Sequence, residues 1–239
     1  MTADETDGTD AAGPGGDGPA DGGRWVEVAP DRIVRWVSNF AERHGPLTTE
    51  PGRKVLVLRG EDGAVAECHP PFPPVTAPAT WPASPTVLAG LIAEHAAIDR
   101  TVGVLLVRLG GYAAGVFAGS PPRLVSSKVG SRLVHGRSAA GGTSQHRFAR
   151  RRENQAASAL AAAADTAVRI LGPYAGRLDA VVLGGDRRAV TGVRADPRLR
   201  PVMKHAVERF LAVPDPRLAV LRDTPRLFLS VRIRLTGPA

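Results

Sequence analysis

Hydrophobic residues recur along the chain in short runs, and their spacing indicates both helices and strands. Near the start of the chain, the residues spaced to form the buried face of a helix are Ile33, Val34, Trp36, Val37 and Phe40. The apolar runs 54–59 and 64–68 that follow predict two strands joined by a tight turn. This part of the chain is therefore expected to form a small α/β extension.

The pattern farther along the chain predicts a larger mixed sheet. Residues 69–85 are rich in proline and are expected to form an extended connection, because proline cannot sustain regular structure. The predicted elements after it are helices at 86–100, 145–171 and 201–211, and strands at 101–108, 112–118, 123–128, 178–183 and 228–235. Hairpin strands, a long helix and a strand–loop–helix unit together indicate an α/β protein, with a mixed sheet flanked by helices.

Charge is distributed unevenly along the chain. The net charge is +8, but the first 23 residues hold six acids and no lysine or arginine, which leaves +14 for the remainder. A charged, glycine-rich segment with little hydrophobic surface cannot offset the entropy lost on ordering, so residues 1–23 are expected to be a disordered acidic tail. The predicted organisation is this tail, the N-terminal extension with its proline-rich connection at 24–85, and a main domain at 86–239.

The basic residues are concentrated in one block. Residues 100–152 contain ten arginines or lysines and no acid. A biased base composition that favours alanine, arginine, glycine and proline would scatter such an excess along the chain. The clustering at 123–152 instead favours a polyphosphate partner such as nucleic acid.

Several classes of site and location are excluded or disfavoured. Cys68 is the only cysteine, so the chain forms no internal disulfide and no cysteine-based metal site. Apolar runs stay well short of the roughly 20 residues that span a bilayer, and the acidic start is unlike a signal peptide. We expect a soluble, cytoplasmic protein without a cofactor.

The candidate chemistry lies where a glycine-rich loop leads into the long helix. Residues 136–142 are small, and Thr143 or Ser144 can cap the helix that follows. The loop has no carboxylate and no P-loop motif, so the candidate reactive group is Gln145. Its amide and backbone N–H can orient a water and stabilise an oxyanion, provided that a partner holds the electrophile beside it.

A basic surface is predicted around Gln145. The candidate RNA-phosphate contacts are Lys128, Arg137, His146, Arg147, Arg150, Arg151 and Arg152. They would attach the helix to nucleic-acid backbone while leaving the loop free to reach the reacting atoms.

This stretch resembles the tip of eukaryotic and archaeal class-1 peptide-chain release factors. In that family a His/Lys-Gly-Arg-Gly-Gly-Gln loop precedes a helix beginning Ser-Ala-x-Arg-Phe-x-Arg. The matching residues here are His135-Gly136-Arg137, Gly141-Gly142, Gln145 and Arg147-Phe148-Ala149-Arg150. The likeness covers roughly residues 91–235, and it implies a ribonuclease-H-like middle domain.

The loop departs from the family motif, and the departure is typical of one subgroup of release factors. Thr143 and Ser144 separate the glycines from Gln145, and residues 138–140 lengthen the loop. This form is similar to the Vms-type release factors of ribosome quality control, and more closely to their actinobacterial VLRF-type peptidyl-tRNA hydrolase relatives. The resemblance implies that Gly141, Gly142 and Gln145 form the catalytic tip.

The same resemblance implies the partners. They are the large ribosomal subunit with its rRNA and peptidyl-tRNA, with no DNA or membrane partner, and the protein is expected to be a monomer. No codon-reading domain is visible in residues 25–68, which favours a codon-independent rescue factor. Two alternatives remain open: a Vms-type nuclease acting on the tRNA acceptor end, and a non-catalytic module that binds the ribosome or RNA.

Overall fold

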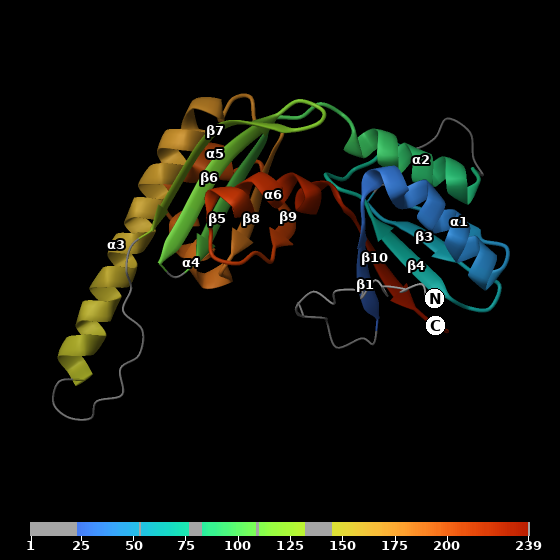
Figure 1. Cartoon of the computed structure of the whole chain (residues 1–239), viewed down its shortest axis with the longest axis horizontal. Helices are drawn as coiled ribbons and strands as arrows, with labels where there is room; N and C mark the ends of the chain where they lie inside the picture. The colour runs from blue at the N-terminus through green and yellow to red at the C-terminus, as the bar shows by residue number, and fades with distance from the viewer. Residues whose placement is uncertain (1–22, 53, 77–82, 109, 132–144, 239) are drawn as a thin grey trace, which may run out of the picture.

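The structure, a computed structural model, describes residues 23–52, 54–76, 83–108, 110–131 and 145–238, with the backbone alone for 51 and 145–154. Two five-stranded sheets lie side by side, each with its own helices (Figure 1). Residues 1–22 of the predicted acidic tail lie outside the described residues, as do the loop residues 132–144.

The first sheet is antiparallel throughout, with the order β1-β10-β4-β3-β2. Two helices cover one of its faces, and Ile33, Val37 and Phe40 are buried there as predicted. The prediction is wrong for Val34, which is exposed, and Trp36 is only half-buried. The bounds of this unit are β1 Arg24–Val28, α1 Ile33–His44, β2 Thr48–Pro51, β3 Leu56–Arg59, β4 Val65–His69, α2 Pro85–Ala96 and β10 Val231–Thr236, with a 3₁₀ turn at Pro30–Arg32 before α1.

The predicted hairpin turn joins β3 to β4. Gly63 adopts a φ of 89°, a left-handed conformation that favours glycine. The N–H of Gly60 donates to the carbonyl of Ala64 at 2.8 Å, and the N–H of Ala64 donates to the Asp62 carboxylate at 3.0 Å. These bonds close the turn as the sequence predicts.

The second sheet is mixed, with the order β7-β6-β5-β8-β9. Strands β5, β6 and β7 are successive antiparallel neighbours, whereas β8 and β9 run parallel to β5. This arrangement confirms the predicted α/β class and its mixed sheet. The bounds are β5 Val102–Arg108, β6 Gly111–Ala118, β7 Arg123–Ser131, α3 Gln145–Leu171, β8 Ala180–Gly185, α4 Arg187–Arg194, α5 Arg200–Met203, β9 Ala206–Leu211 and α6 Leu218–Leu229, with 3₁₀ turns at Gly172–Tyr174 and Pro197–Leu199.

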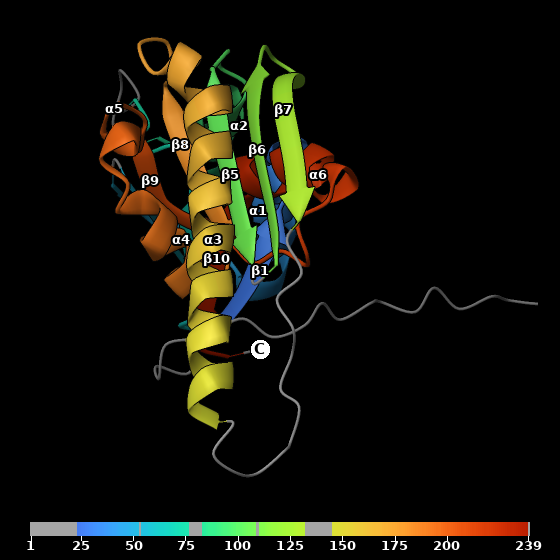
Figure 2. The same ribbon diagram turned by 90° about the vertical axis from the view of Figure 1, so that its left-hand side faces the viewer.

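Helices cover both faces of the second sheet. Helices α3, α4 and α5 pack on one face, where Leu105, Val116 and Leu183 lie in the core. Helix α6 covers the other face through Leu221 and Phe228. The sheet is therefore the middle of three layers (Figures 1 and 2).

Two predicted elements near the carboxyl end are wrong. The predicted helix at 201–211 contains only the short α5, and its second half is the edge strand β9, which pairs parallel with β8. The predicted strand at 228–235 begins only at Val231, because residues 218–229 form α6. The sequence does not predict this helix because it contains Pro225, whose nitrogen cannot donate to the Leu221 carbonyl. The Thr224 hydroxyl donates to that carbonyl instead, at 2.7 Å.

Helix α2 and strand β10 belong to the packing of the first sheet. Leu88 and Ile92 of α2 lie in the same core as Ile233 of β10. The division of the chain near residue 86 stays a prediction. Because these elements share the first core, we propose that the N-terminal unit takes in both α2 and the carboxy-terminal strand.

A half-buried arginine links the two sheets. Arg209 of β9 donates to the carbonyl and the hydroxyl of Ser230, which precedes β10, and lies 3.5 Å from Glu27 of β1. Burial lowers the pKa of the Arg209 guanidinium to about 10. These contacts tie the edge of the second sheet to the first.

Candidate functional site

Helix α3 carries most of the predicted site. It runs from Gln145 to Leu171, as predicted, and its 27 residues correspond to a length of about 40 Å. A 3₁₀ turn containing Pro173 follows it directly. The alanine-rich run explains its length, because alanine has the highest helix propensity.

The two ends of α3 have different surroundings. The carboxyl half packs on the second sheet through Ala163, Ala164, Ala167 and Leu171, which are at most 3% exposed. The amino-terminal half extends past the edge of the sheet and stands away from it (Figures 1 and 2). Leu160, the first described hydrophobic of α3 against this core, lies fifteen residues after Gln145, or about 22 Å along the helix. We call the segment 145–154 the arm.

The loop after β8 lies beside the base of the arm. Gly185 adopts a φ of 102°, and a Cβ there would lie 2.2 Å from the Val107 carbonyl oxygen. The N–H of Asp186 donates to that same carbonyl at 2.7 Å. The Asp186 carboxylate then caps α4 by accepting from the N–H of Ala189 at 2.8 Å. The loop is thereby held against the end of β5.

Helices α3 and α4 approach closely just behind the arm. A Cβ at Gly192 of α4 would lie 2.9 Å from a methyl carbon of Leu160, so a glycine there permits the contact. Val190 and Val193 of α4 lie in the core that also holds the α3 alanines. The base of the arm is therefore packed on two sides.

The predicted site residues fall into three groups. Arg137, Gly141 and Gly142 lie outside the described residues, as do the candidate cap residues Thr143 and Ser144. The backbone alone is described for the arm, which holds Gln145, His146, Arg147, Arg150, Arg151 and Arg152. The structure thus brings these six positions together at one projecting helix end.

Lys128 is the one predicted site residue whose side chain is described. It lies on the edge strand β7, is exposed, and pairs with Ala114 of β6. Because cross-strand partners share a face, and Ala114 belongs to the core under α3, Lys128 lies on the face of the sheet that α3 covers. It adds positive charge beside the helix.

Sequence reasoning missed two arginines near the base of the arm. Arg108 ends β5; its guanidinium donates to the Val213 carbonyl at 2.8 Å and lies 3.8 Å from the Asp215 carboxylate. Arg188, in the first turn of α4, is exposed. The pair Arg187-Arg188 directly after a glycine loop was the available signal.

The described residues contain no group of three or more histidine, cysteine, aspartate or glutamate side chains placed to hold a metal ion. None of the helices within the described ranges has the length and apolar character that crossing a bilayer requires.

Comparison with known proteins places the chain in a family. The profile of the family described as Actinobacteria/chloroflexi VLRF1 release factor matches residues 100–234, more than half of the chain. The chain belongs to the VLRF1 release factor family. The matched segment contains the second sheet, the arm and every predicted site residue, and membership implies ribosome-associated peptide release.

Three solved structures are similar to this chain at low sequence identity. The structure titled "Vms1 mitochondrial localization core" is 8% identical with a TM-score of 0.41, covering 87% of this chain and 84% of that one. The archaeal translation termination factor aRF1 is 16% identical with a TM-score of 0.41, covering 84% and 56%. A chain titled "Archaeal protein" is 16% identical with a TM-score of 0.36, covering 70% and 48%. This chain thus spans about half the length of the two archaeal proteins, and a search of curated sequences gives no match.

Proposed function

We propose that this VLRF1 release factor is a ribosome-associated peptidyl-tRNA hydrolase. It would free the nascent peptide from tRNA on stalled ribosomes or large subunits in the cytoplasm, without reading a codon. Family membership supports the general activity. The position of Gln145 supports the assignment of the residue.

The observation that carries the proposal is the geometry of α3. Gln145 is its first residue, at the end that stands away from the sheet, while the other end is packed into the core. A ribosome encloses its reactive ester within RNA, so a catalytic group must reach it on a narrow projection. A single helix, about 10–12 Å across with its side chains, suits that requirement.

The proposed chemistry is hydrolysis of the ester between the peptide and the terminal ribose of tRNA. A water oxygen bonds to the ester carbonyl carbon, the bond from that carbon to the ribose oxygen breaks, and the ribose oxygen takes up a proton. The Gln145 amide and backbone N–H would orient the water and stabilise the developing oxyanion. The ribosome supplies the positioning that makes this uncharged group effective.

The basic residues would hold the arm against RNA. Arg147, Arg150, Arg151 and Arg152 lie on the first two turns of α3, with His146 beside them. Arg137 in the preceding loop and Lys128 on β7 would extend the same surface. Glycines 141 and 142 would let the loop adjust as Gln145 approaches the ester.

The direct test is a release assay on stalled ribosome–nascent-chain complexes. Gln145→Ala should lower the rate of release about 100- to 1,000-fold, the usual cost of removing one oxyanion-stabilising donor. Gln155→Ala is a matched control, because it removes the same side chain from the same helix ten residues farther on. Equal release by the wild type and Gln145→Ala would remove Gln145 from the mechanism.

Analysis of the product separates hydrolysis from the alternative reactions. A released peptide with a free carboxylate supports ester hydrolysis, whereas a peptide that still carries nucleotides indicates cleavage of the tRNA acceptor end. Binding to large subunits without any release would indicate a non-catalytic ribosome-binding module.

A further inference from the structure

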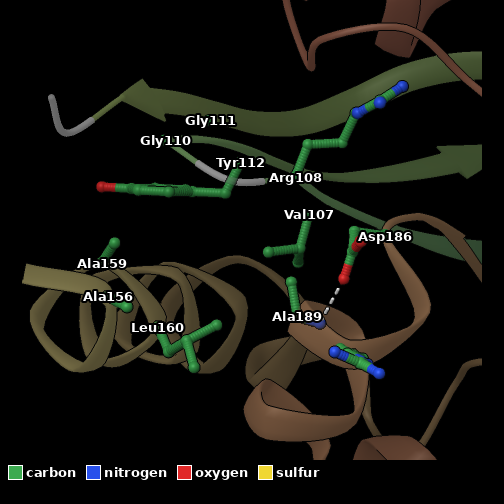
Figure 3. Close-up of a pocket in the computed structure, with 11 residues that line it drawn as sticks. Val107, Arg108, Gly110, Gly111, Tyr112, Ala156, Ala159, Leu160, Asp186 and Ala189 are labelled. Atoms are coloured by element: carbon green, nitrogen blue, oxygen red, sulfur yellow. Dashed lines mark hydrogen bonds between the residues drawn. The ribbon is translucent and has the colours of Figure 1, made fainter. Parts of the chain in front are cut away.

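A pocket of about 340 Å³ opens at the base of the arm (Figure 3). One wall is α3, where Ala156 and Ala159 are small and Leu160 provides apolar surface. The remaining walls come from the turn between β5 and β6 and from the first turn of α4. The volume falls in the usual range for small-ligand sites, and the α3 wall is apolar as such sites generally are.

An aromatic ring forms the opposite wall. Tyr112 pairs across the sheet with Gly130, and a Cβ at Gly130 would lie 2.4 Å from the Tyr112 Cζ. The ring therefore lies flat over the glycine backbone, which fixes its orientation. Figure 3 shows this ring edge-on, facing Ala156 and Ala159 across the pocket. A flat ligand can stack on the free face of the ring.

Charged groups stand at the α4 end of the pocket. The Asp186 carboxylate is held there by the N–H of Ala189 at 2.8 Å and can accept further hydrogen bonds from a ligand. Arg188 lines the same end and is exposed. The Arg108 guanidinium turns instead toward Val213, so of the two arginines described in the pocket wall it is Arg188 that can meet an anionic group of the ligand.

We propose that this pocket binds one unpaired nucleotide of RNA. Its base would stack on Tyr112 against the alanine wall, its amino group would donate to Asp186, and its phosphate would bind Arg188. Unpaired RNA bases are commonly held by aromatic stacking with polar contacts to their edges. The inference rests on the proposed function and deepens it, because it adds an RNA contact about 16 Å along α3 from Gln145.

The surrounding charge favours RNA over other flat ligands. The chain has no acid between Arg100 and Arg152, a segment that provides the β5–β6 turn and ends at the arm. Lys128 lies on the same face of the sheet as the pocket. A polyanion attached to the base would therefore run along a positive surface toward the arm.

The test fills the pocket without removing charge. Ala156→Leu places a larger side chain in the pocket, whereas Ala157→Leu is the matched control, because Ala157 is exposed and does not line it. Binding of a fluorescent single-stranded RNA hexanucleotide to the full chain should weaken at least about tenfold in Ala156→Leu and stay within about twofold in Ala157→Leu. Equal affinities of these two variants, with unchanged unfolding midpoints, would overturn the proposal.

A second pair tests the phosphate contact. Arg188→Gln should weaken binding of the same hexanucleotide severalfold, while Arg194→Gln, an exposed arginine at the other end of α4, should not. Equal weakening by both would mean that general charge accounts for the affinity, and it would overturn the role of Arg188.

The source of the nucleotide is identified with two larger RNAs. If a CCA-ended acceptor minihelix binds Ala156→Leu more weakly than Ala157→Leu, the nucleotide comes from the tRNA end. If purified large subunits show that difference in affinity, it comes from rRNA. Failure of both to discriminate overturns the proposal. Release assays separate the pocket hypothesis from the proposed function. If Gln145→Ala loses peptide release while Ala156→Leu and Ala157→Leu bind RNA with equal affinity, the pocket hypothesis fails and the proposed function stands.

Discussion

The two halves of α3 are continuous in backbone but opposite in composition. Residues 145–154 contain four arginines, whereas 155–171 contain eight alanines and a single arginine. The second half lies on the sheet with Ala163, Ala164 and Ala167 in the core, and the first half stands away from the sheet (Figure 1). Burial therefore determines the composition of one half, and charge determines that of the other.

One helix therefore contains both a segment packed on the sheet and a projecting arm. Alanine brings the helix backbone close to the sheet, and Leu171 fills the core at its end. Since the helix continues without a break into the arm, the packed half also orients the arm.

The largest effect is expected in the packed half. Leu171→Ala removes a fully buried side chain and should lower the free energy of unfolding by about 2–5 kcal/mol. Urea denaturation measures the change. Arg169→Ala, an exposed neighbour, should stay within about 0.5 kcal/mol. Similar losses in both variants would mean that α3 is not anchored as described.

An intermediate effect is expected from charge in the arm. Arg150→Gln should weaken binding to large subunits and reduce the slope of log K against log salt by about one, because one phosphate contact no longer releases counterions. Arg169→Gln removes the same charge from the packed half and should leave the slope unchanged. Titration at several salt concentrations measures both, and equal slopes for these variants would contradict a role for the arm.

The smallest effect compares glycine in the two halves. Ala162→Gly should lower the free energy of unfolding by about 1 kcal/mol, the usual cost in a helix interior. Ala149→Gly should lower it by less than half as much, because the arm frays without unfolding the core. Thermal or urea denaturation distinguishes them. An equal cost at both positions would show that the arm contributes to global stability.

Local patterns predicted much of the second sheet. The bounds of α3 followed from its alanine run and the glycine and proline that end it, and the β5–β6 hairpin followed from apolar runs around Gly110 and Gly111. Both signals act over a few residues. The basic character of the arm was predicted in the same way, because Arg147, Arg150, Arg151 and Arg152 lie within six residues of sequence.

Elements that depend on distant pairing were not predictable in this way. The sequence of β9 predicts a helix, because Val207 and Phe210 have the spacing of a helix face. Pairing with β8 makes that segment a strand instead. The placement of β10 between β1 and β4 depends on contacts across more than 160 residues of sequence. The pocket at Tyr112 was missed for the same reason, since its walls come from three separate segments.

The central claim is that Gln145, at the free end of α3, acts on the ester of peptidyl-tRNA. The most direct measurement is the single-turnover rate of peptide release from stalled complexes, with Gln145→Ala and Gln155→Ala compared at saturating protein. The account predicts a loss of about 100- to 1,000-fold for Gln145→Ala, a rate near that of the wild type for Gln155→Ala, and large-subunit binding unchanged in both. Wild-type release by Gln145→Ala, or an equal loss in both variants, would contradict it.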